Sequence, residues 1–385
     1  SYYLVRKNLS LAAPGMMADG LLDKETAGFA MAGIPIAYAF SKFLMGSLSD
    51  RSDARKFLVV GLIIAAAVMM SVGLIPYSSS IAINGGILFA FMLAVGWLSG
   101  MGWPPCGRIM AHWFSQNERS FKMSIWNTSH NTGAGTLALL VSAGIAVFTA
   151  VGIAESWRAA FIFPSVVAMC VAMFCWWALR DTPESCGLPP IEEYRNDYTS
   201  RKAAAGEETT IPFRRLFVDY VFKNHLLWMI AIANVFVYFI RYGISDWSPT
   251  YLQDMQIMSA SESRVAFSLF EYAGIPGTII CGWLSSRFFQ GRCAPVNVIY
   301  MLMVLVGVLC YWQADAVASV FGGEAALPMV IYFSLGLTGF AVYGPIALIG
   351  IQALSFVPKN AAGTAAGFVG LFGYLLGDAL LSKII

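Results

Sequence analysis

Runs of about 20 apolar residues, long enough for a helix to cross a lipid bilayer, follow one another along most of this 385-residue chain. Ten such runs are present, and residues 1–18 have the composition of the outer part of one more. The runs lie at 26–49, 57–77, 82–110, 120–150, 157–179, 225–252, 263–286, 294–314, 325–356 and 361–385. The sequence therefore predicts an all-α integral membrane protein with eleven spans. Because the chain begins and ends inside apolar runs, we expect a twelve-helix protein whose first and last helices are truncated here.

The composition agrees with this class. Hydrophobic residues make up 58% of the chain and charged residues only 12%, whereas a soluble domain carries about a quarter charged residues. The net charge of +2 is too small to favour nucleic acid as a partner. The seven cysteines form neither a paired framework nor a CxxC pattern, so we expect no disulfide scaffold and no metal. The expected surroundings are a lipid bilayer.

Basic residues gather in alternate connections between the runs, which predicts that those connections face the cytoplasm. The remaining connections hold little beyond Lys24, Arg158 and Arg264. The longest polar stretch, 181–223, belongs to the basic set and is predicted to be a cytoplasmic linker. It divides the chain into an N-terminal half, 1–180, with spans 1–6, and a C-terminal half, 224–385, with spans 7–11. Span 12 is expected to be missing, and both termini of the protein are expected in the cytoplasm.

Two short passages recur at nearly the same spacing. Tyr3-Leu4-Val5-Arg6 is echoed by Tyr238-Phe239-Ile240-Arg241, 235 residues later, and Gly46-Ser47-Leu48-Ser49-Asp50-Arg51 is echoed by 282–287, 236 residues later. Parallel six-helix repeats with a substrate site between them near mid-membrane are a transporter architecture. The second passage, with Gly46, Asp50 and Arg51, marks a cytoplasmic helix end. It is either a gate motif or a charged end that only fixes topology.

Arg6 and Arg241 occupy equivalent positions in the two repeats, at depths where a charge costs about 2.5–3.5 kcal/mol. The planar guanidinium fork matches phosphate or carboxylate oxygens bidentately. One arginine from each half would therefore converge on a single anion, and a dianionic phosphate suits two cations better than a monocarboxylate does. The alternative is that each arginine only pairs with a nearby acid, for which Asp246 and Glu271 are the candidates.

Two lysines and the same two acids are expected near the arginine pair. Lys7 adjoins Arg6 but points about 100° away round the helix, so we expect an intramembrane charge network in which Lys7 pairs with Asp246 or Glu271. Lys42 lies near the cytoplasmic end of the second span. It either helps to bind the anion or extends its side chain to the interface.

His130 lies in a polar patch that begins at Trp126 and includes Asn127. Histidine titrates near neutrality, so His130 could donate a hydrogen bond to phosphate; the alternative is a satisfied structural histidine. Tyrosine hydroxyls are further candidate donors, although membrane tyrosines commonly serve packing alone. The tyrosines considered are Tyr3, Tyr38, Tyr343 and Tyr374. No nucleophile–base pair or phosphate loop is present, so neither an enzyme nor a cofactor is expected.

The strings YYLVRKN, GMGWPPCGR, RYGISDWSPTYL and PKNAAGTAAGF resemble the organophosphate:inorganic phosphate antiporters of the major facilitator superfamily. The resemblance implies that superfamily's fold, with two six-helix pseudo-repeat halves, and a monomer in the bacterial cytoplasmic (inner) membrane. It implies import of glycerol 3-phosphate in exchange for inorganic phosphate. It also implies that Arg6 and Arg241 hold the phosphate, that Lys42 and His130 assist, and that Lys7, Asp246 and Glu271 are intramembrane charge partners.

Alternatives to this function remain open at the level of sequence. Hexose-phosphate relatives carry an acid and a base in the eleventh span where this chain has Ala366 and Val369, which favours glycerol 3-phosphate. Asp378 and Lys383 depart from the uncharged pattern and leave room for another ester. A transporter-like sugar-phosphate receptor, and a proton-coupled carboxylate symporter using Glu271, are the other candidates.

Overall fold

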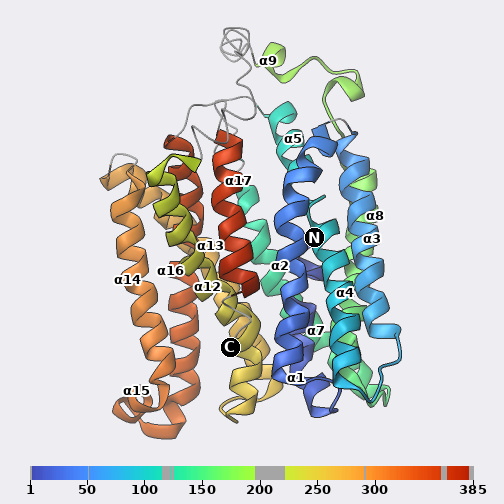
Figure 1. Ribbon diagram of the computed structural model, residues 1–385, viewed down its shortest axis with the longest axis vertical. Coiled ribbons are helices and arrows are strands. Elements are labelled where there is room, and N and C mark those ends of the chain that lie inside the picture. The colour runs from blue at the N-terminus through green and yellow to red at the C-terminus, as the bar shows by residue number, and fades with distance from the viewer. Residues whose placement is uncertain are drawn as a thin grey trace.

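The computed structural model describes residues 2–50, 52–114, 122, 125–195, 222–289, 292–356 and 362–380, and this part of the chain is helical without strands (Figure 1). Eight of its helices are long and apolar enough to cross a membrane. The other expected spans, at 1–18, 26–49 and 361–385, are largely helical where they are described.

The N-terminal half consists of η1 (Tyr2–Val5), α1 (Asn8–Ala18), α2 (Lys24–Asp50), α3 (Ala54–Leu74), α4 (Ile81–Ser99), α5 (Trp103–Trp113), α7 (Ser129–Ala150), η2 (Ser156–Arg158) and α8 (Ala159–Ala178). The short turns η3 (Glu184–Cys186) and α9 (Ile191–Tyr194) follow it. The C-terminal half consists of α12 (His225–Asp254), α13 (Ala260–Phe288), α14 (Cys293–Trp312), α15 (Ala314–Phe321), η5 (Gly323–Ala326), α16 (Leu327–Ser355), α17 (Ala362–Phe372) and the π-helical turn η7 (Gly373–Leu380).

One expected span is interrupted. The apolar run 82–110 forms α4 and then α5, with a turn between Ser99 and Trp103. The residues after Trp103 are two prolines, which lack backbone N–H groups and are therefore found at the start of a helix. A Cβ at Gly102 would lie 2.8 Å from the ring of Tyr2, so the turn needs glycine where it packs against η1.

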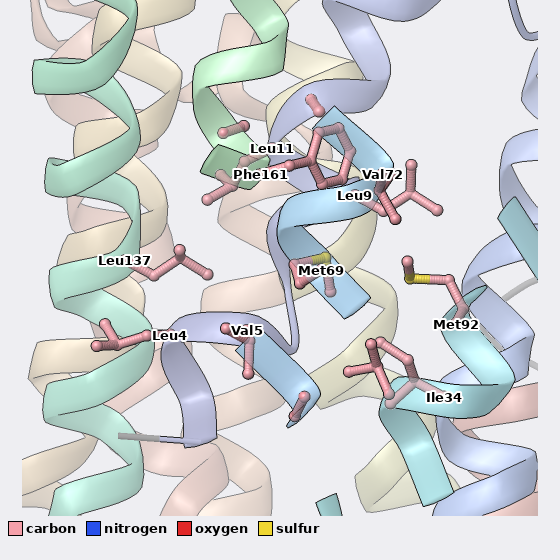
Figure 2. Close-up of a cluster of buried hydrophobic side chains, with 14 of the residues drawn as sticks. Leu4, Val5, Leu9, Leu11, Ile34, Met69, Val72, Met92, Leu137 and Phe161 are labelled. Carbon is pink, nitrogen blue, oxygen red and sulfur yellow. The ribbon is translucent and has the colours of Figure 1, made fainter. Parts of the chain in front are cut away.

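Each half has its own apolar core. In the N-terminal half the core surrounds η1 and α1 and includes Leu4, Val5 and Leu9 (Figure 2). These side chains pack against residues of α3, α4, α7 and α8, such as Met69 and Phe161. Because Leu4 and Val5 directly precede Arg6, their burial fixes the backbone that carries this arginine. A second cluster, built from α12, α13, α14, α16 and α17, plays the same part in the C-terminal half.

Helices within a half approach closely where glycines face a neighbouring backbone. A Cβ at Gly277 of α13 would lie 1.8 Å from the carbonyl oxygen of Phe340 of α16, and one at Gly339 would lie 2.0 Å from that of Phe270. Small residues of this kind let helices in a membrane pack backbone against backbone. The pairing of α13 with α16 is therefore fixed by sequence at two levels along the bundle.

The two halves are joined near the end of the molecule where α2 begins and α12 ends, which is at the bottom of Figure 1. We call this the outer end, as the distribution of basic residues predicts. Phe267 of α13 belongs to the apolar core of the N-terminal half. Polar contacts between the halves include the ion pair Lys24–Asp254 (2.8 Å) and the hydrogen bonds Arg264–Ser142 (2.7 Å), Ser268–Gly135 (3.0 Å) and Thr136–Tyr272 (2.9 Å). The outer end is thus closed.

Candidate anion-binding site

Two buried arginines, one from each half, lie at the centre of the bundle. Arg6 follows the short helix η1, just before α1 begins, and Arg241 lies in the middle of α12. Their exposed fractions are 5% and 4%. Within the described part of the chain, neither forms an ion pair with a carboxylate within 4.0 Å, and Nε of Arg6 is buried without a hydrogen-bond partner. The described residues therefore do not show the alternative in which nearby acids neutralise both arginines by ion pairing.

Tyrosine rings surround the guanidinium groups instead. The Cζ atom of Arg6 lies 4.3 Å from the ring centre of Tyr38 and 5.1 Å from that of Tyr3. The Cζ atom of Arg241 lies 4.6 Å from Tyr343 and 4.8 Å from Tyr242. A cation over an aromatic face is stabilised by about 0.5–2 kcal/mol. The rings therefore stabilise both charges without neutralising either.

These four tyrosines, together with Tyr238 of α12 and Tyr374 of η7, form what we call the tyrosine cage. Tyr374 connects its two sides. Its ring centre lies 4.9 Å from that of Tyr38, in the N-terminal half, and 5.0 Å from that of Tyr238, in its own half. Tyr238 and Tyr242 are cage residues that the sequence did not single out as ligands. The signal was available, because positions 238, 241, 242 and 245 share one face of a helix and include Arg241.

The buried acids have other partners. Asp246 forms an ion pair with Lys7, across the two halves, and Nζ of Lys7 also lies 4.3 Å from the ring centre of Tyr242. Glu271 accepts a 2.5 Å hydrogen bond from the hydroxyl of Tyr343 and one of 3.5 Å from the amide of Asn131. These two carboxylates consequently form no ion pair that would neutralise either arginine.

His130 lies within the cage, between Tyr343 at 5.5 Å and Tyr3 at 5.7 Å. Its Nδ1 contacts the backbone carbonyl of Asn127, and since a carbonyl only accepts, Nδ1 carries the hydrogen there. Nε2 is then the atom that remains for a ligand. Asn127 takes part through its backbone. Lys42 lies one turn from Tyr38, with Nζ 5.5 Å from the ring centre of Trp103.

The gate motif is only partly described. Gly46 and Asp50 lie in the last turns of α2, whereas Arg51 lies outside the described residues. In the eleventh span, Val369 is buried in the core of its half, and Lys383 lies outside the described residues.

A small cavity adjoins Arg6 on the side of the outer end. Its volume is about 20 Å³, and its polar lining consists of Arg6, Lys7, Ser10, Asp246 and Asp378. Since a water molecule needs about 10–15 Å³ by this measure, the cavity is smaller than a phosphate ester. The described conformation is closed around the arginines, and Asp378 belongs to their immediate surroundings.

Comparisons with known proteins agree with this architecture. A sequence profile of the Major Facilitator Superfamily matches residues 1–381. A glycerol-3-phosphate transporter of Bacillus subtilis is 47% identical over 384 residues, which cover 100% of this chain and 82% of that protein. A glycerol-3-phosphate transporter of Haemophilus influenzae is 42% identical over 398 residues, again covering 100% of this chain and 82% of that protein.

Among solved structures, a bacterial homologue of the human lysosomal transporter Spinster, in an inward-facing and unoccupied conformation, is similar with a TM-score of 0.72. The alignment covers 99% of this chain and 78% of that one, at 16% sequence identity. A likeness at that identity concerns the fold alone.

Proposed function

This chain belongs to the Major Facilitator Superfamily, and we propose that it is an antiporter that imports glycerol 3-phosphate in exchange for inorganic phosphate. The observation that carries the proposal is the pair of buried arginines, one from each half, whose charges no described carboxylate neutralises by ion pairing. The two relatives named as glycerol-3-phosphate transporters support the choice of ester.

In this proposal the phosphate group binds between Arg6 and Arg241. Each guanidinium offers parallel N–H donors to two phosphate oxygens, and a hydrogen bond to a charged group contributes about 1.5–3 kcal/mol. The hydroxyls of the tyrosine cage donate further hydrogen bonds to the phosphate, and Nε2 of His130 donates one when the imidazole is protonated. Lys42, one turn closer to the cytoplasmic end than Tyr38, would meet the anion on its way in or out on that side.

Exchange follows from the charges of the empty site. Without an anion, two cations from opposite halves repel each other, and this repulsion opposes the approach of the halves that reorientation requires. A bound phosphate dianion offsets both charges and draws the halves together, so the loaded carrier reorients faster than the empty one. Cytoplasmic phosphate then displaces the imported ester, and the outward phosphate gradient drives uptake.

The network of Lys7, Asp246 and Glu271 would couple the site to the outer end. The Lys7–Asp246 ion pair bridges the halves beside the cavity at Arg6. An anion that attracts Lys7 would weaken this ion pair, and separation of α1 from α12 at the outer end would become easier. The Glu271 carboxylate accepts hydrogen bonds from Tyr343, whose ring lies beside Arg241, and from Asn131, and would link the site to α7.

Uptake of labelled glycerol 3-phosphate by proteoliposomes, with and without phosphate inside, tests the proposal. Antiport requires uptake only in phosphate-loaded vesicles, and competition by glucose 6-phosphate then ranks the esters. Uptake that needs no internal phosphate but is abolished by an uncoupler would identify a proton symporter and refute antiport. Ligand binding that depends on Arg6 and Arg241, without transport, would identify a receptor.

A further inference from the structure

A third arginine is buried at the outer end of the seam between the halves. Arg264 lies one turn inside α13 and is 8% exposed. Its Nε donates a 2.7 Å hydrogen bond to the hydroxyl of Ser142 on α7. Within the described ranges, no carboxylate forms an ion pair with it. Burying a charge against a neutral hydroxyl is unfavourable, and an ionisable residue inside a membrane protein is a functional candidate for that reason.

Arg158, also near the outer end, shows what a structural arginine looks like in this chain. Its Nη1 donates 2.8 Å hydrogen bonds to the carbonyls of Gly73 and Ile75, which satisfy the end of α3. Its Nε pairs with Glu155, and its Cζ lies 4.8 Å from the ring centre of Trp157. Among the described residues, Arg264 caps no helix end and pairs with no such acid.

The face of α13 that carries Arg264 leads to the central site. Arg264, Ser268 and Glu271 are spaced by four and three residues, so they lie on one side of the helix. The hydroxyl of Ser268 donates a hydrogen bond to the carbonyl of Gly135, and the carboxylate of Glu271 accepts one from the amide of Asn131, both on α7. From Arg264 to Glu271 is seven residues, or about 10.5 Å along the helix. The seam therefore runs between the halves from the outer end to the tyrosine cage.

We propose that Arg264 is an external docking site for the phosphate group of the incoming anion. The inference rests on the proposed function. When the halves part at the outer end, the hydrogen bond to Ser142 breaks and the guanidinium lines the opening. An anion meets this cation about two turns before it reaches Arg241, and a positively charged entrance raises the rate of association. In the outward-closed state Arg264 is covered, so it acts on external substrate only.

Because Arg264 would act on external substrate only, transport measured separately from the two faces of the membrane tests the docking role. The intact protein is reconstituted with known orientation, and exchange of labelled inorganic phosphate is measured while external or internal phosphate is varied. Arg264→Gln is expected to lower the external kcat/KM about 10-fold and to weaken its dependence on ionic strength, because a steering charge is screened by salt. The internal kcat/KM should stay within about twofold, and Arg264→Lys should retain most of the external rate.

Ser142→Ala separates docking from a mere latch. It removes the hydrogen bond that closes the seam but leaves the guanidinium, so the docking role predicts a nearly unchanged external kcat/KM. Arg158→Gln is the matched control, and it should lower thermal stability without a difference between the two faces. Arg264→Met replaces the Gln variant if the latter does not fold.

Three outcomes would overturn the docking role. They are a Ser142→Ala variant that reproduces Arg264→Gln, an equal loss of kcat/KM on both faces, and an Arg264→Gln variant that matches the wild type from outside. A wild-type protein that exchanges no phosphate at all refutes the proposed function instead, and the docking role with it.

Discussion

Replacing Arg241 tests the proposed contribution of the C-terminal half to phosphate binding. Arg241 is 4% exposed and, among the described residues, forms no carboxylate ion pair that would have to be broken first. Arg241→Gln removes two charge-assisted hydrogen bonds to phosphate, each of about 1.5–3 kcal/mol. It also removes a buried charge and two cation–π contacts, which partly offset each other. The expected loss is therefore about 3–6 kcal/mol in binding, or roughly 100- to 10,000-fold in affinity.

A second substitution separates charge from geometry. Arg241→Lys keeps a cation over the rings of Tyr343 and Tyr242 but loses the planar fork that matches two phosphate oxygens. We expect it to lose about tenfold in affinity, one hydrogen bond's worth, and to retain slow exchange. Arg292→Gln serves as the control, because Arg292 is an exposed arginine of the same half at the start of α14.

The assay is equilibrium binding of labelled phosphate to the purified protein in detergent, followed by phosphate exchange in proteoliposomes. Binding reports the lost contacts directly, and exchange reports whether the remaining charge still supports reorientation. If Arg241→Gln binds and exchanges phosphate within about threefold of the wild type, the two-arginine site is wrong.

Two further substitutions test how the bundle is held together. Lys7→Ala removes the cation that pairs with the buried carboxylate of Asp246 and should lower the stability of the protein by about 3–5 kcal/mol. The double variant with Asp246→Ala should recover part of this stability, and thermal unfolding in detergent measures both. Gly277→Ala places a Cβ 1.8 Å from the backbone carbonyl of Phe340 and should destabilise the protein by at least about 1–3 kcal/mol. Gly282→Ala adds a carbon with nothing within 4 Å of it and should be tolerated. Equal melting temperatures of the two variants would contradict the close packing of α13 on α16.

The helical fold was predictable because the apolar runs are a signal of length and composition, and these are properties of the local sequence. The superfamily expected from the resemblance is confirmed by the profile match over residues 1–381, and the expected fold agrees with the solved structure that is similar to this chain. The break between α4 and α5 was not predicted. Hydropathy records how apolar a segment is but not where its helix is interrupted, and the interruption coincides with the glycines and prolines around Trp103.

The candidate site was suggested by the sequence where the repeat supplied the information. Arg6 and Arg241 were recognised because a common offset of 235 residues places them at equivalent positions. The partner of Lys7 was not decided by sequence, because Asp246 and Glu271 are both within a plausible distance along the membrane and only the packing of α1 on α12 selects Asp246. The absence of a described acid partner for either arginine likewise depends on tertiary structure.

The tyrosine cage explains how a carrier can hold two unneutralised arginines and still release its substrate. A carboxylate partner for Arg6 would form a buried ion pair, and breaking such a pair costs about 3–5 kcal/mol, which phosphate would have to overcome on every cycle. Rings such as Tyr38 and Tyr343 contribute only about 0.5–2 kcal/mol each. They make the empty site tolerable without competing strongly for the cations. Under the proposed function, an anion would therefore bind well enough to bring the halves together, and the next anion could displace it.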